Sequence, residues 1–140
     1  MSTTLYQMLV GFHVAANLVW IGSILSVARA LLSRADDSRA GAQIAYELYR
    51  KLAMPAFVVS FVTALARLLM SLDLYFGETK YMHGKLLFAT IVIVLHHVIG
   101  RIARGVASGR RSSAGPVGVL AFLLGTSAVA ATLFVIVKPF

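Results

Sequence analysis

Four histidines lie within or beside apolar stretches of this 140-residue chain, at positions 13, 83, 96 and 97. Imidazole binds transition metals and haem iron, and it exchanges protons near neutral pH. An ionisable side chain is costly to place in lipid, so each of these histidines is a functional candidate. Two imidazoles from different helices that clamp one iron, with cations nearby for the propionates, would form a b-type haem site.

Helical spacing sorts the polar residues into faces. In the first apolar stretch, His13, Asn17 and Trp20 are four and then three residues apart, which places them on one face. The third stretch carries two polar stripes, well over a quarter-turn apart. These stripes are His83, Thr90, His97 and Arg101, and Lys85, Val92 and His96. Unless the third helix is tightly surrounded, one stripe meets a partner subunit or a cofactor groove, so a homo-oligomer is a hypothesis.

Basic side chains that fall toward one side of the chain's apolar layer suit haem propionates. They are Arg67, Lys80, Lys85 and Lys138. The alternative is structural: membrane histidines and Asn17 hydrogen-bond across helices, and Lys138 extends to the interface. A copper site of His and Met is a further option. No acid lies well inside a span, since Glu47 is near the end of the second one, which disfavours a carboxylate proton relay.

The elements that must position these residues are membrane helices. The chain is 59% hydrophobic and 13% charged, with a mean hydropathy of +0.86, which is too apolar for a soluble domain of this size. We predict an all-α four-helix integral membrane bundle in a single domain, with spans at about 5–32, 42–72, 82–106 and 117–137. Pro55 lies inside the second span and predicts a kink there.

The net charge of +8 reflects topology rather than nucleic-acid binding. Basic residues cluster between the apolar runs without aromatic interleaving, and most of them lie on the side that holds the first and third loops. The positive-inside rule therefore predicts that both termini lie outside the cytoplasm. We also expect the chain to be a multi-pass protein of the bacterial inner membrane. The chain has no cysteine, which excludes disulfides, thiolate metal sites and iron–sulfur clusters.

Taken in order, the motifs of all four helices resemble the HemJ-type protoporphyrinogen IX oxidases, small membrane proteins related to CopD-like copper-resistance domains. The matching positions are His13, Trp20 and Arg29, then Leu48, Tyr49, Pro55 and Ala56, then His83, Lys85, Leu86, His96, Gly100 and Arg101, and the final Lys-Pro-Phe. The resemblance implies a haem-b oxidase that removes six electrons and six protons from the porphyrinogen and passes the electrons to a quinone.

The resemblance also implies roles for individual residues. His13 with either His83 or His96 would ligate the iron, and the choice between the two pairs stays open. Other cofactor contacts are expected from Asn17, Trp20 and Arg67, and substrate or propionate contacts from Lys85, Arg29, Arg101 and Lys138. Two alternatives remain: a non-enzymatic haem or electron-transfer subunit, and a CopD-like copper-handling protein.

Overall fold

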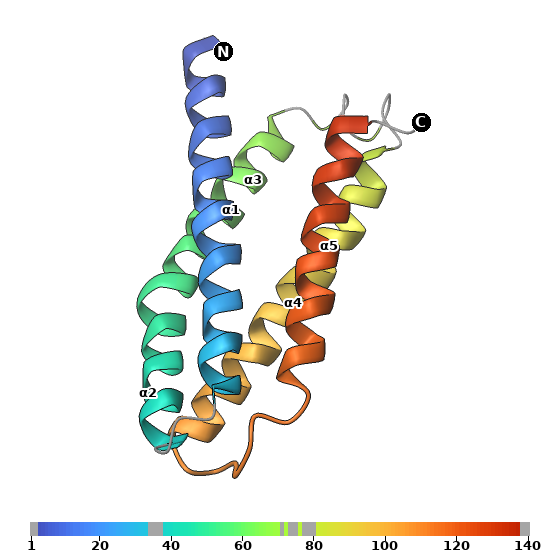
Figure 1. Cartoon of the computed structure of the whole chain (residues 1–140). Helices are drawn as coiled ribbons and strands as arrows, with labels where there is room; N and C mark the ends of the chain where they lie inside the picture. Colours follow the sequence, from blue (N-terminus) through green and yellow to red (C-terminus); the bar gives the residue numbers. More distant parts are fainter. Residues whose placement is uncertain (1–2, 34–37, 71, 73–75, 77–80, 138–140) are drawn as a thin grey trace.

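The computed structural model describes residues 3–33, 38–70, 72, 76 and 81–137, and within them four helical stretches are long and apolar enough to cross a membrane (Figure 1). These stretches are α1 (Thr3–Leu32), the run of α2 (Ser38–Leu48), η1 (Tyr49–Ala53) and α3 (Met54–Leu69), then α4 (Tyr81–Ala107) and α5 (Val117–Val137). The predicted all-α four-helix membrane bundle is confirmed, and no strand occurs in the part of the chain that the structure describes.

The second span departs most from the predicted bounds. It begins at Ser38 rather than near residue 42, so the loop predicted to extend to Gly41 is already helical. Arg39, Ala40 and Gln43 favour a helix, but a polar first turn adds nothing to hydropathy and so escapes an apolar-run prediction. At the other end α3 stops at Leu69, three residues before the predicted end, because an apolar run does not mark where the backbone turns.

The kink predicted at Pro55 takes the form of a wider turn. Proline has no N–H, and its ring conflicts with the carbonyl four residues earlier, here that of Lys51. The chain responds with the π-helical segment η1, in which the Met54 N–H reaches back to the Tyr49 carbonyl. The Tyr49 ring lies 5.1 Å from the His96 ring, centroid to centroid, and it occupies the space where Gly100 has no side chain.

Gly100→Ala is expected to destabilise the bundle by about 1–3 kcal/mol, because the added Cβ would collide with the Tyr49 ring. The measurement is thermal unfolding in detergent, followed by circular dichroism. Gly22→Ala is the matched control, since nothing lies within 4 Å of a Cβ at that exposed helical position. Equal melting temperatures for the two variants would contradict the close packing of Tyr49 on α4.

The bundle consists of two closely packed sides. α1 packs mainly on α3 and α2, and α4 packs mainly on α5. The core that joins them is apolar and includes Trp20, Ile24, Ile99 and Leu124. The beginning of α1 and the end of α5 lie at the same end of the bundle, as Figure 1 shows. We call this the terminal end, and the opposite end, where α1 runs toward α2 and α4 toward α5, the loop end.

Candidate functional site

His13 is held between α1 and α3 by hydrogen bonds to both ring nitrogens. Its Nδ1 lies 3.0 Å from the Ser60 carbonyl oxygen, and its Nε2 lies 3.0 Å from the Asn17 amide nitrogen. The Ser60 hydroxyl donates to Asn17 Oδ1 at 2.7 Å, and the Thr63 hydroxyl lies 3.4 Å from His13 Nδ1. Ser60 is buried, while His13 and Asn17 are half-buried. The four side chains form one inward network.

The direction of each hydrogen bond in this network follows from Ser60. A carbonyl oxygen only accepts, so Nδ1 of a neutral His13 must carry the proton and donate it. Nε2 then keeps its lone pair and accepts from the Asn17 amide, whose oxygen accepts from the Ser60 hydroxyl. An imidazole oriented by Nδ1–H on a main-chain carbonyl, with its lone pair on Nε2, is the form that ligates metals in proteins.

Two cations approach this network from different helices. Arg67 of α3 donates from Nη2 to the Tyr6 hydroxyl at 3.2 Å, and its guanidinium carbon lies 5.3 Å from the centroid of the Tyr6 ring. Lys85 of α4 is half-buried and lies within electrostatic range of Arg67 and of His13. Arg67 Nε is buried and has no hydrogen-bond partner among the described residues. This end of the molecule is therefore prepared for negative charge.

The acidic residues do not answer these cations within the described structure. Glu47 is the one acidic residue in the described ranges, and it pairs with Lys51 near the loop end at 2.8 Å. A carboxylate or phosphate of a ligand would be a suitable partner for Arg67 and Lys85. Tyr6 is part of this cluster through its contacts with Arg67.

His96 is fully buried in an aromatic cage in the core. The Trp20 indole N–H donates to its Nδ1 at 3.0 Å, and Met54 Sδ lies 3.3 Å from its Nε2. The Phe57 ring stacks on the imidazole at a centroid distance of 5.1 Å. The Trp20 ring contacts the imidazole edge-on, at a centroid distance of 5.6 Å. Sequence reasoning placed Trp20 on the face of His13, and His96 on one of two polar stripes of the third span, but did not pair them.

The cage occupies both ring nitrogens of His96. Indole nitrogen only donates, so Nδ1 of His96 must be the unprotonated nitrogen, and Nε2 then carries the proton toward Met54. Coordination through either nitrogen would require breaking the Trp20 hydrogen bond or removing the Nε2 proton. The same argument disfavours a copper ion between His96 and Met54.

The candidate iron ligands do not form a pair around one position. Trp20 follows His13 by seven residues and contacts His96, so His13 and His96 are offset by about 10 Å along the bundle, at ~1.5 Å per residue. By the same measure His83 is offset from His13 by about 9 Å in the opposite direction. These offsets do not favour the predicted bis-histidine clamp, and they leave His13, with Arg67 and Lys85 nearby, as the candidate for a single imidazole ligand.

The two polar stripes of α4 separate cleanly in the structure. The stripe with Lys85, Val92 and His96 faces inward, with its members buried or half-buried. The other stripe is exposed on the outside of the helix. Its members are His83, Thr90, His97 and Arg101. His83 has an edge-on contact with the Phe76 ring, at a centroid distance of 5.7 Å. The homo-oligomer stays a prediction, now with a defined face, and native mass spectrometry tests it.

The remaining predicted contacts lie away from His13. Arg29 is exposed in the last turn of α1, and Arg101 is exposed near the loop end of α4. Both belong to the loop end, whereas His13 and Lys85 lie toward the terminal end. Lys138 lies outside the described residues. The structure thus gathers Asn17, Arg67 and Lys85 around His13, and leaves Arg29 and Arg101 apart from it.

Ser60 and Thr63 were not among the predicted site residues. Their spacing of three and four residues from each other and from Arg67, which places all three on one helix face, was the signal that could have found them. The function of Ser60 rests on its main-chain carbonyl, which carries no side-chain signature. No group of three or more His, Cys, Asp or Glu residues is placed to hold a metal ion in the described ranges. A haem site with one imidazole ligand does not need such a group.

Comparisons with protein-family models, with curated proteins and with solved structures find no match to this chain. Its function is therefore inferred from the geometry around His13.

Proposed function

We propose that this chain binds haem b through His13 and works as a membrane oxidoreductase on a porphyrinogen. The observation that carries the proposal is the orientation of His13, with Nδ1–H on the Ser60 carbonyl and the Nε2 lone pair capped only by the neutral Asn17 amide. A neutral amide is readily exchanged for a stronger partner, since one such hydrogen bond contributes about 1 kcal/mol net. Iron would take its place.

The charges at the terminal end support a tetrapyrrole in particular. Haem b and protoporphyrinogen IX both carry propionate carboxylates, and Arg67 and Lys85 are cations held inside the bundle near His13. A charge-assisted hydrogen bond from guanidinium to carboxylate is among the stronger polar contacts a protein makes. Arg67 Nε has no partner among the described residues, which leaves a donor for such a carboxylate.

The proposed reaction is the six-electron, six-proton oxidation of protoporphyrinogen IX to protoporphyrin IX. Haem b, when bound, supplies a one-electron carrier, and a quinone of the bacterial inner membrane accepts the electrons. The residues of this chain hold and orient: Ser60 fixes the His13 ring, and Arg67 with Lys85 binds and aligns the carboxylates. The protons leave toward the terminal end, where Arg67 and Lys85 are half-buried.

The first test is the visible spectrum of the detergent-purified full chain. We expect a Soret band with haem near one equivalent per chain. Stoichiometric copper without a Soret band would favour the copper-handling alternative. The second test is rescue of a bacterial strain that lacks porphyrinogen oxidase. Haem binding without rescue, at normal expression, would leave a non-enzymatic electron-transfer subunit as the function.

A further inference from the structure

One outer face of the bundle carries an apolar groove that the haem proposal does not use. It consists of two hollows of about 340 Å³ and 320 Å³, which share Lys51 and Leu52. The first runs between α1 and α3 and is lined by Phe12, Ala15, Ala16, Val19, Lys51, Leu52, Pro55, Ala56 and Val59. The second continues along α2, past Ile44, Glu47 and Leu48. The groove therefore extends from mid-bundle toward the loop end.

The floor of the groove suits an alkyl chain. Small side chains, those of Ala15, Ala16 and Ala56, let α1 and α3 form a shallow channel, and Phe12 and Val59 rise exposed at its inner end. From Lys51 to Val59 the channel spans eight residues, or about 12 Å. All lining residues of this part except Lys51 are apolar, so the channel offers water few hydrogen-bonding groups.

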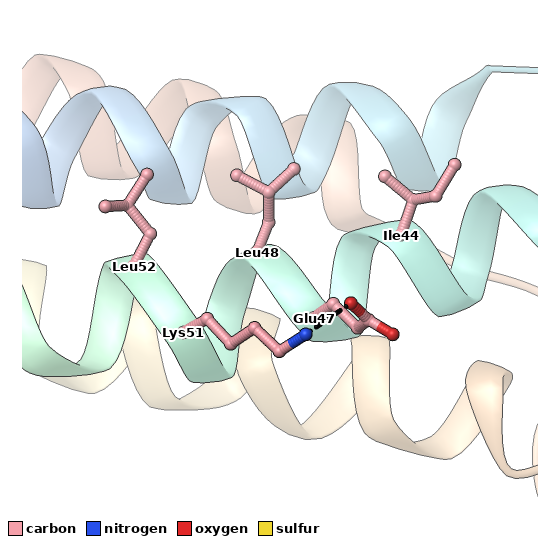
Figure 2. Close-up of a pocket in the computed structure, with 5 residues that line it drawn as sticks. All are labelled: Ile44, Glu47, Leu48, Lys51 and Leu52. Atoms are coloured by element: carbon pink, nitrogen blue, oxygen red, sulfur yellow. Dashed lines mark hydrogen bonds and ion pairs between the residues drawn. The ribbon is translucent and has the colours of Figure 1, made fainter.

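The groove is basic where its two hollows meet. Lys51 Nζ lies 2.8 Å from Glu47 Oε2, and both side chains are about two-thirds exposed, so this pair is weak and exchangeable. Figure 2 shows Ile44, Leu48 and Leu52 in one row along α2 and η1, with the Lys51–Glu47 pair beside them. Arg50 directly precedes Lys51 on the same segment and has no ion-pair partner in the described ranges.

We propose that this groove binds an anionic phospholipid, with one acyl chain along α1 and α3 and the headgroup phosphate at Arg50 and Lys51. Basic pockets at the cytoplasmic ends of membrane helices recognise anionic headgroups in this way. The loop end is the side on which the basic residues concentrate, which is where such headgroups are found in the positive-inside orientation. This proposal does not depend on haem binding.

Charge decides between this occupant and two others. A second copy of the chain, packed side by side in the same orientation, would bring its own basic loop end against Arg50 and Lys51. A quinone has an apolar tail that suits the channel, but its neutral head would not pair with the positive charge of Arg50 and Lys51. The phosphate of a phospholipid pairs with this charge, and the acyl chain of the same lipid fills the channel.

The test is native mass spectrometry of the delipidated full chain, offered equal amounts of dioleoyl-phosphatidylglycerol and dioleoyl-phosphatidylcholine. Wild type is expected to retain one phosphatidylglycerol preferentially. Arg50→Gln with Lys51→Gln should lower this occupancy about tenfold or more. Arg110→Gln with Arg111→Gln removes the same charge from exposed loop positions and should leave it unchanged.

A second pair of variants tests the channel without changing charge. Ala15→Phe fills the groove and should displace the lipid, whereas Val14→Phe, on an exposed neighbouring position outside the groove, should not. Three results would overturn the proposal. They are equal losses in both charge variants, equal retention of phosphatidylcholine, or a co-purified quinone that phosphatidylglycerol fails to displace.

Discussion

His13→Ala is expected to abolish haem binding, so that the purified variant shows no Soret band at any haem concentration that saturates wild type. The substitution removes the half-buried imidazole whose Nε2 lone pair is capped only by the Asn17 amide. It also leaves the Asn17 amide inside the bundle without this partner, which costs about 1–3 kcal/mol, whereas the Ser60 carbonyl still accepts from the Thr63 hydroxyl. The measurement is haem titration by absorbance in detergent.

Two companion experiments separate ligation from folding. His97→Ala removes an imidazole from an exposed position of α4 and should keep the full Soret band. Added imidazole should restore haem to His13→Ala, because a small free ligand can occupy the space that the side chain vacates. A His13→Ala protein that folds and holds haem at wild-type affinity would remove His13 from the site and leave the proposed function without its main support.

The paired substitution Arg67→Gln with Lys85→Gln is expected to raise the KM for protoporphyrinogen at least about a hundredfold. Each hydrogen bond to a charged group contributes about 1.5–3 kcal/mol, and two of them would be lost. The effect should fall mainly on KM rather than kcat if these cations bind carboxylates remote from the reacting carbons. The measurement is porphyrin fluorescence in proteoliposomes that contain a quinone.

The matched control for that experiment is Arg104→Gln with Arg110→Gln, which removes two exposed charges at the loop end. It should change KM by less than about threefold. Equal losses in both variants would mean that the net charge of the protein, rather than a local site, governs the approach of the substrate. If the first variant loses haem as well as showing a raised KM, the two cations would be assigned to the haem propionates instead.

The four spans follow from the sequence because backbone groups in lipid must bond within their own helix, and long apolar runs leave no other choice. Two features of the second span do not follow from apolar runs. The polar first turn of α2 is helical outside the apolar layer, and the π-helical turn before Pro55 depends on how one proline is accommodated. Hydropathy registers neither.

The candidate site was predictable to the level of helix faces. Spacing placed His13 with Asn17 and divided α4 into two stripes, but it gave no reason to turn one stripe inward rather than the other. That choice depends on partners distant in sequence: Trp20 is 76 residues from His96, and Tyr49 packs where Gly100 leaves space. The protonation of each imidazole depends on those partners too, which is why the iron ligand pair stayed open.

The closed hydrogen-bond network around His13 has a consequence for biogenesis. Both nitrogens of the imidazole and both ends of the Asn17 amide already have protein partners. Membrane insertion and helix assembly can therefore reach completion on the polypeptide alone, with no polar group of this network waiting for a prosthetic group to satisfy it. Cofactor loading becomes a separate, later event, in which one amide gives way and the surrounding scaffold stays as it was built.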